Sequence, residues 1–201
     1  MSTDRPLLKS YAPPPVDRTE ILRYAGIKQP TAELLSLLEE CLAELSGILC
    51  FRVVYCTVPV LRTEEGILLG SVSIPSHDLS KNLRGCDRAI LFAATLGEGI
   101  DRLMARYAVL SPAKELLLQA IGTERIEALC DRFCEDMRAE VAREEKALRP
   151  RFSPGYGDLP LAVQRELFAY LDCARRIGLC LNESLLMSPL KSVTAIVGIQ
   201  E

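Results

Sequence analysis

Apolar residues recur at helical spacing in several parts of the chain. Between residues 31 and 45 they fall three, four and seven positions apart, which predicts an amphipathic helix that ends near Gly47. Capping residues and apolar spacing predict further helices. These cover 17–25, 100–109, a segment from Ser111 to about Lys146 that Gly122 interrupts, and 160–172.

Other segments have the valine-rich or alternating pattern of strands. Strands are predicted over 50–60 and 66–74, paired antiparallel through a turn at 62–65. A buried strand over 88–97 and a closing strand over 191–200 are also predicted. Because helices and strands do not alternate one by one, the order argues against a doubly wound nucleotide-binding fold. We predict an α+β fold, a single domain with a mostly antiparallel sheet packed by several helices.

The N-terminal segment has a different composition. Residues 1–16 contain four prolines, which resist regular structure and predict an extended arm laid on the surface. The length of 201 residues suits one domain. We therefore divide the chain into an arm, 1–16, and a domain, 17–201.

Composition and charge narrow the possible functions. With 49% hydrophobic and 25% charged residues, the chain is typical of a folded globular protein. Its 24 basic and 27 acidic residues give a net charge of −3, which argues against a nucleic-acid groove or a polybasic membrane patch. The sequence has no apolar stretch near the roughly 20 residues that span a bilayer, and residues 1–7 lack the pattern of a secretory signal. We expect a cytoplasmic protein.

Eight cysteines raise the question of a metal site or a disulfide framework. No C-x-x-C pair is present, and His77 is the single histidine, so the usual zinc pattern is missing. Cys130 and Cys134 are four residues apart and offer two sulfurs on one helix face, but that face is apolar. We expect these thiols to be buried in the core as small hydrophobic groups, without disulfides or metal.

Two short motifs carry little chemistry. Gly97-Glu98-Gly99 lies between a predicted strand and a predicted helix, where amides can bind an anion, but Glu98 repels phosphate and the dinucleotide fingerprint is incomplete. We interpret it as a turn. With one histidine in a polar segment, His77-Asp78 does not mark a catalytic pair.

The segment 149–160 is the strongest candidate for a ligand site. Its prolines are rigid and its glycines allow close backbone approach. Arg151 can pair with a carboxylate through two hydrogen bonds, and Tyr156 offers a flat apolar face with a hydroxyl. The residues alone leave two interpretations equally open, a ligand-binding loop and a structural loop that caps a helix.

A family resemblance bears on this choice. Arg-Phe-Ser-Pro-Gly-Tyr at 151–156 resembles the R-x-x-x-G-Y signature of the activation domain of vitamin B12-dependent methionine synthase. The segment 182–193, with its Glu-Ser, Met-x-Pro and Ser-Val pairs, is similar to the family's T-E-S…M-x-P…S-V segment. Asp17-Arg18-Thr19 resembles the family's D-x-T opening, whereas residues 30–145 match loosely.

The resemblance implies a ligand and a set of contacts. Domains of this family bind S-adenosylmethionine so that an inactive cob(II)alamin on the enzyme can be reduced and remethylated. By resemblance, Arg151 holds the methionine carboxylate, and Asp17 meets the ammonium group. An arginine with several carboxylates suits a zwitterion that also carries a sulfonium charge. The remaining implied contacts are the backbone of Ser153 and Gly155, the ring of Tyr156, and two further acidic positions, Asp131 and Glu145.

The resemblance also implies partners. The chain matches only an activation domain, so it is expected to act in trans, as an activation subunit in methionine biosynthesis and not as a catalyst by itself. Its expected partner is a cobalamin-dependent methionine synthase or another corrinoid protein, with electrons from a flavodoxin-like or other reductase. Two alternatives stay open: a non-catalytic assembly or docking subunit that has lost ligand binding, and an independent methyltransferase with a non-corrinoid acceptor.

Overall fold

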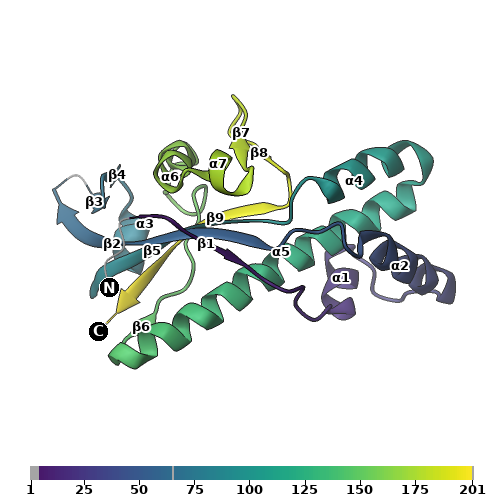
Figure 1. The fold of residues 1–201 in the computed structure, drawn as a ribbon, viewed down its shortest axis with the longest axis horizontal. Coiled ribbons are helices and arrows are strands. Elements are labelled where there is room, and N and C mark those ends of the chain that lie inside the picture. Colours follow the sequence, from purple (N-terminus) through teal and green to yellow (C-terminus); the bar gives the residue numbers. More distant parts are fainter. Residues whose placement is uncertain (1–4, 65, 201) are drawn as a thin grey trace.

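An antiparallel sheet runs through the centre of the molecule (Figure 1). The computed structural model describes residues 5–64 and 66–200, and all strand pairs within those ranges are antiparallel. The main sheet has the order β4-β3-β2-β5-β9-β6, and β1 also pairs with β2. Its strands are β1 (Leu7–Ser10), β2 (Arg52–Thr63), β3 (Gly66–Leu69), β4 (Val72–Ile74), β5 (Cys86–Thr95), β6 (Ala147–Leu148) and β9 (Ser192–Gln200). The short strands β7 (Cys180–Leu181) and β8 (Met187–Ser188) pair separately.

Both faces of the sheet are covered by helices (Figure 1). Successive side chains of a strand point to opposite faces, so β5 sends Ile90 and Phe92 to one face and Leu91 to the other. The first face packs against α5 (Pro112–Val141), where Phe133 contacts Phe92 with ring centroids 4.8 Å apart. The second face packs against α3 (His77–Asn82), α6 (Val163–Leu171) and α7 (Cys173–Ile177). The predicted α+β fold with a mostly antiparallel sheet is confirmed.

A third group of helices packs on the first half of α5, beyond the end of the sheet (Figure 1). It consists of α1 (Arg18–Tyr24), α2 (Ala32–Leu45) and α4 (Gly99–Leu110). Their buried side chains, such as Ile21 and Leu38, meet Leu117 of α5. With 30 residues α5 is about 45 Å long, so it joins the sheet to this helical cluster.

The N-terminal arm departs from the prediction of an irregular segment. Residues 7–10 form β1, in register with β2 from Leu7 opposite Tyr55 to Ser10 opposite Arg52. The prolines at 13–15 follow this strand, and residues 11–16 have no regular structure, as expected. Residues 1–4 of the predicted arm lie outside the described residues. The arm is therefore joined to the sheet by a ladder and is not simply laid on the surface.

The predicted interruption of the long helix is wrong. Gly122 lies within α5, which is continuous. A Cβ atom at this position comes within 2.7 Å of Ile100 Cδ1 and 2.8 Å of Lys191 Cγ. Glycine therefore serves close packing here and does not break the helix.

Other element boundaries differ in smaller ways. The predicted strand 66–74 is divided at Gly70, whose φ of 59° makes the turn between β3 and β4. The sequence patterns do not predict α3, α7, β6, β7 and β8, each six residues or shorter, or the 3-10 turn Ala142–Glu144.

The cysteines are free thiols, most of them in the core. Six of the eight are buried, whereas Cys50 is half-buried and Cys180 is exposed. Burial raises the pKa of Cys130 and of Cys134, so both are neutral thiols near pH 7. The prediction that these two lie in the core is confirmed. Among the described residues, no group of three or more potential ligands could hold a metal ion, and no helix is long and apolar enough to cross a membrane.

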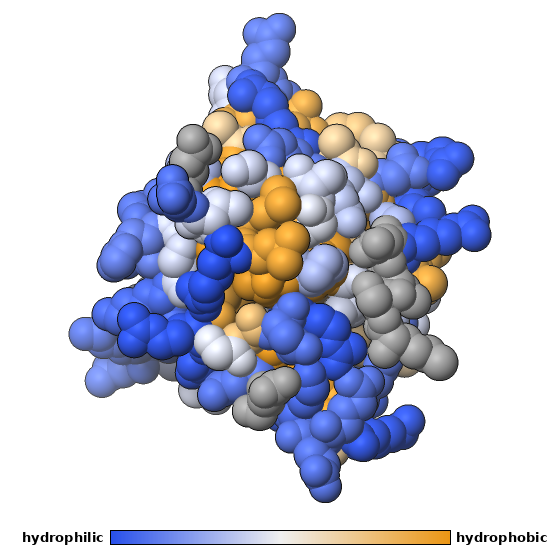
Figure 2. Space-filling view, turned by 90° about the vertical axis from the view of Figure 1, so that its left-hand side faces the viewer, coloured by the Kyte–Doolittle hydropathy of each residue, from blue (hydrophilic) through white to orange (hydrophobic). Residues whose placement is uncertain are grey.

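The end of the sheet that carries the β2–β3 hairpin has a mixed surface. Figure 2 looks onto this end and shows apolar residues in the middle of the face, with hydrophilic side chains around them. Leu61 of β2, opposite Leu68 of β3 in the ladder, is among the exposed large apolar side chains. The helices that cover the two sheet faces therefore leave some apolar surface open at this end.

Candidate functional site

The loop 149–160 is fastened to the edge of the sheet. The Arg149 amide donates to the Gly198 carbonyl at 2.9 Å, and Phe152 forms an isolated antiparallel bridge with Ile196 of β9. Gly155 and Gly157 then adopt φ values of 89° and 54°, which glycine tolerates and other residues rarely do. These contacts hold the backbone of residues 151–156 against β9.

Asp158 ties the same loop to α3. Its carboxylate accepts hydrogen bonds from the Ser76 hydroxyl at 2.5 Å and from the His77 amide at 2.8 Å. A Cβ atom on Gly157 would lie 2.4 Å from the Asp78 carboxylate, so the two segments are in close contact. His77-Asp78 therefore has a structural role here, as the partner of the loop.

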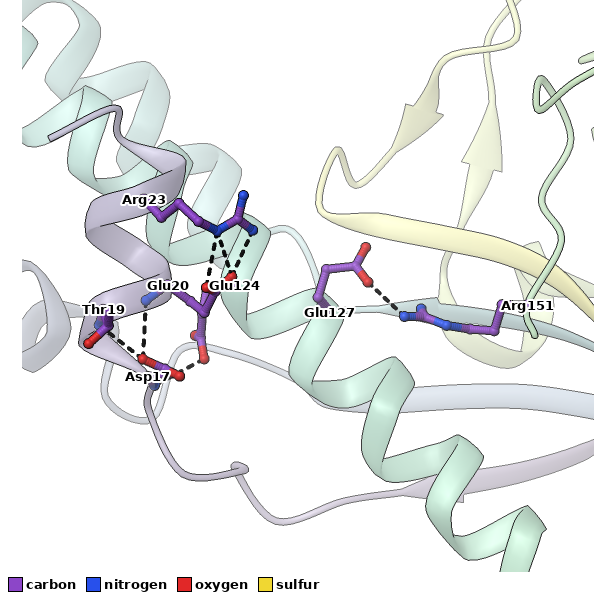
Figure 3. A network of polar contacts seen from close by, with 7 residues as sticks. All are labelled: Asp17, Thr19, Glu20, Arg23, Glu124, Glu127 and Arg151. Atoms are coloured by element: carbon purple, nitrogen blue, oxygen red, sulfur yellow. Dashed lines mark hydrogen bonds and ion pairs between the residues drawn. The ribbon is translucent and has the colours of Figure 1, made fainter. Parts of the chain in front are cut away.

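Arg151 reaches from this loop to α5. Its Nη2 atom donates to Glu127 Oε2 at 2.9 Å and to Asp131 Oδ1 at 3.0 Å, and Figure 3 shows the first of these contacts. The side chain is 26% exposed. Burial alone lowers the pKa of an arginine, but nearby groups, including these two carboxylates, raise the pKa of Arg151 overall. The guanidinium is therefore charged and partly open to solvent.

A cavity of about 410 Å³ lies beside Arg151. Its wall combines the loop, α5, α6 and the start of β9. Tyr156 is 73% exposed, with its ring edge-on to Phe152 at 6.4 Å between centroids, so it presents a flat apolar surface. The lining residues are Glu127, Arg151, Ser153, Pro154, Tyr156, Gln164, Met187, Ser192, Val193 and Thr194.

A second hollow, of about 570 Å³, adjoins the first and is strongly acidic. Glu127 lines both hollows, and Asp131, which lines the second, is also bound to Arg151. The walls come from the end of the N-terminal arm, α1 and the middle of α5. The lining residues are Pro14, Pro15, Asp17, Glu20, Tyr24, Glu124, Glu127, Ala128, Asp131, Arg132 and Glu135.

A buried ion pair holds the N-terminal arm against this hollow. Glu124 and Arg125 are neighbours on α5, 5% and 3% exposed, and their side chains are paired. Arg125 donates at 2.6 Å to each of the carbonyl oxygens of Pro14 and Pro15. Glu124 accepts from the Asp17 backbone amide at 3.1 Å, as Figure 3 shows. Apart from their bonds to each other, Glu124 and Arg125 therefore use their side chains to fix the segment that leads into α1.

Asp17 begins α1 at the edge of the acidic hollow. Its Oδ1 atom accepts from the amides of Thr19 and Glu20, at 2.9 and 3.1 Å, which makes it the N-cap (Figure 3). Its Oδ2 atom has no hydrogen bond to any described residue. Asp17 therefore caps a helix and keeps one carboxylate oxygen for another partner.

The structure brings most of the predicted site residues together. Arg151, Ser153 and Tyr156 line one hollow, and Asp17 and Asp131 line the adjoining one. Gly155 belongs to the same loop but lines neither hollow. Glu145 lies past the C-terminal end of α5, with a left-handed φ of 59°, and lines none of the cavities described here.

Several residues at the site were missed from the sequence, among them Glu124, Glu127 and Gln164, together with Arg125, which holds the arm beside the acidic hollow. One signal was available, because Glu124, Glu127 and Asp131 are spaced three and seven apart and share a helix face. The sequence does not single out the Glu124–Arg125 pair, because its burial depends on the arm that packs over it. No sequence motif or spacing marks Gln164 as a site residue.

Comparisons with known proteins identify the family and the fold. The model of the family "vitamin B12 dependent methionine synthase, activation domain" matches residues 78–201. A search of the curated proteins gives no match. Among solved structures, the crystal structure of the MetH reactivation domain bound to AdoHcy is similar, with a TM-score of 0.70 and 17% identity over 98% of this chain and 79% of that one. At this identity the likeness shows a common fold. Because the family model spans more than half of the sequence, the chain belongs to the activation-domain family of vitamin B12-dependent methionine synthase.

Proposed function

We propose that this chain binds S-adenosylmethionine in the two adjoining hollows and serves a cobalamin protein as its reactivation partner. The observation that carries the proposal is the meeting of Arg151, from the R-x-x-x-G-Y loop, with Glu127 and Asp131 of α5 at the junction of the hollows. The similar reactivation domain was solved with AdoHcy, the product that remains after S-adenosylmethionine loses its methyl group. This supports the same class of ligand here.

The charges at the junction complement such a ligand. S-adenosylmethionine carries one carboxylate and two positive groups, the ammonium and the sulfonium. Arg151 would take the carboxylate in two charge-assisted hydrogen bonds, in exchange for Glu127 or Asp131. The released carboxylate would then face the positive groups of the ligand. In the structure Arg151 is paired with both carboxylates, so its partly buried charge is not left without a counter-charge.

The other predicted residues complete the proposed contacts. The backbone of Ser153 would hydrogen-bond the ligand, and the exposed ring of Tyr156 would pack on it. Gly155 lines neither hollow and its amide donates to the Leu159 carbonyl, so it would shape the loop and not contact the ligand through that amide. Asp17 would contribute its free Oδ2 atom from the far side of the acidic hollow. Glu145 lies apart from these groups, and we leave it outside the proposed site.

In this proposal the chain binds and orients, and its partner reacts. The partner's cobalamin would supply a nucleophilic cobalt, and a flavodoxin-like or other reductase would supply the electron that restores it. The residues of this chain would hold the methyl group within reach of that cobalt. The partner is a cobalamin-dependent methionine synthase or another corrinoid protein.

Isothermal titration calorimetry tests the ligand directly. We expect the wild type to bind S-adenosylmethionine, and Arg151→Ala to weaken binding about 10- to 100-fold through the loss of charged hydrogen bonds. Arg175→Ala is the matched control, because Arg175 is a 79% exposed arginine paired with Asp172 in a different part of the molecule. No heat with the wild type at millimolar ligand contradicts the proposal.

A reactivation assay tests the role. An oxidised corrinoid protein, a reductant and S-adenosylmethionine are combined with the chain, and methylcobalamin is followed by its absorbance. We expect the wild type to accelerate its formation and Arg151→Ala to fail. Equal acceleration by both proteins indicates a docking subunit that does not use the ligand site.

A further inference from the structure

Gln164 is buried in the wall of the Arg151 cavity without a hydrogen-bond partner. It is the second residue of α6, and its backbone amide donates to the Leu161 carbonyl at 3.0 Å. Its side chain is different: the residue is 5% exposed, and its Oε1 atom is buried without a hydrogen-bond partner among the described residues. Folded proteins pair the large majority of buried polar side-chain atoms, so an orphaned amide requires an explanation.

The position of Gln164 distinguishes it from the other unpaired groups. Six buried side-chain atoms among the described residues have no partner, and only the Gln164 oxygen belongs to a residue that lines one of the cavities described above. Asn82 and Asp101 are also in this group, but each keeps a second polar atom that is hydrogen-bonded. At Gln164 the unpaired oxygen belongs to a residue of the cavity wall, beside the side chains proposed to hold the ligand.

Two of the polar side chains that line the cavity with Gln164, Ser192 and Arg151, already have partners. The Ser192 hydroxyl is bonded to the Thr95 hydroxyl and to the Pro189 carbonyl, each at 2.8 Å. Arg151 is held by Glu127 and Asp131 on α5. The missing partner of the Gln164 amide is therefore best supplied by a molecule that enters the cavity.

The chemistry of an amide selects one part of the proposed ligand. An amide is neutral and offers a donor and an acceptor side by side. The ligand's carboxylate only accepts hydrogen bonds and its ammonium only donates them, whereas an adenine edge presents an amino donor next to a ring-nitrogen acceptor. Glutamine pairs with that edge through two hydrogen bonds when proteins read adenine in DNA.

We propose that Gln164 is a specificity-determining residue that hydrogen-bonds the adenine base through its side-chain amide. This inference rests on the proposed function, because it assigns one end of the same ligand. The charged end of the ligand lies at the junction of the hollows with Arg151, and its base lies against α6. Gln164 thereby distinguishes an adenine nucleoside from one that lacks the 6-amino group.

Gln164→Met provides the test, because methionine keeps the length of the side chain and removes both polar atoms. If the amide is unpaired in the free protein, the variant unfolds at the wild-type temperature or above it. Its affinity for S-adenosylmethionine falls at least about tenfold, since the base loses its hydrogen bonds. Gln119→Met, on α5 and outside the described cavities, is the control and keeps wild-type affinity.

Two nucleosides identify the group that is recognised. Adenosine and purine riboside, which differ by the 6-amino group alone, compete with S-adenosylhomocysteine in calorimetry. The wild type prefers adenosine at least about fivefold, and Gln164→Met binds both equally. Equal binding of the two nucleosides by the wild type overturns the assignment to adenine.

The remaining outcomes separate this inference from the proposed function. Wild-type affinity in Gln164→Met overturns the role of Gln164 and leaves the ligand site intact. A clear loss of thermal stability in Gln164→Met shows that the amide has a structural partner, and it overturns the inference as well. If the wild type binds neither S-adenosylmethionine nor S-adenosylhomocysteine, both proposals fail.

Discussion

A single carboxylate ties the candidate binding loop to α3. Asp158 accepts hydrogen bonds from the Ser76 hydroxyl and from two amides at the start of α3. The Ser76 hydrogen bond, with the help of these amides, lowers the pKa of Asp158 below its usual value of 3.8. The charged form of Asp158 is therefore the one that the folded protein favours.

Asp158→Asn is expected to lower stability near neutral pH and to have little effect in acid. Because the folded-state pKa lies below the unfolded value, the contribution of the charge is fully present above about pH 5 and is lost as the pH falls through the folded-state pKa. Urea unfolding at several pH values measures this. Glu98→Gln, which changes an exposed carboxylate, serves as the control. If the free energies of unfolding of wild type and Asp158→Asn differ by the same amount from neutral pH down to pH 3, this explanation is contradicted.

At the scale of elements, the pairing of the N-terminal arm with α5 depends on Arg125. Its guanidinium bonds the Pro14 and Pro15 carbonyls, and its partner Glu124 bonds the Asp17 amide. Removing the arginine leaves Glu124 buried without its counter-charge, which costs about 3–5 kcal/mol in comparable pairs. We expect Arg125→Met to lower the free energy of unfolding by about that amount, as measured in urea.

The control for this variant is Arg23→Ala, which removes an arginine from an exposed pair with Glu20. Substitutions at exposed positions of this kind usually change the free energy of unfolding by no more than about 0.5 kcal/mol. Amide hydrogen exchange locates the destabilised segment, and we expect faster exchange in residues 7–24 of Arg125→Met than in the same residues of the wild type. An Arg125→Met protein as stable as Arg23→Ala contradicts the role of the pair.

How far the sequence predicts an element depends on the element's length and surroundings. The patterns behind α2, α4, β5 and β9 are long enough to show a period, and these elements were predicted within a few residues. β1 has only four residues and lies next to prolines. It is a strand because it pairs with β2, whose residues are 42 to 48 positions further along the chain. Gly122 was predicted to interrupt α5 because glycine is a poor helix former, whereas the packing of Ile100 and Lys191 decides its place.

At the scale of the whole molecule, the site residues also divide into those that a local sequence pattern predicts and those that depend on tertiary packing. A contiguous motif marks Arg151, Ser153 and Tyr156, so these residues were found from the sequence. Glu127 and Gln164 come from two different helices, and their place beside Arg151 follows from the way α5 and α6 pack on opposite faces of the sheet. No local pattern carries that information, because it belongs to the tertiary structure.

The groups proposed to hold the charged end of the ligand come from three segments that are far apart in the sequence: the arm with α1, the middle of α5, and the loop 151–156. A ligand that bridges both hollows must stabilise all three together. At 100 times its dissociation constant, a ligand adds about 2.7 kcal/mol to the folded state. We expect S-adenosylmethionine to slow amide exchange in residues 11–24, 124–131 and 151–156 at once, and to leave the β3–β4 hairpin unchanged. Protection confined to 151–156 indicates that the ligand occupies only the Arg151 cavity, and it removes Asp17 from the proposed contacts.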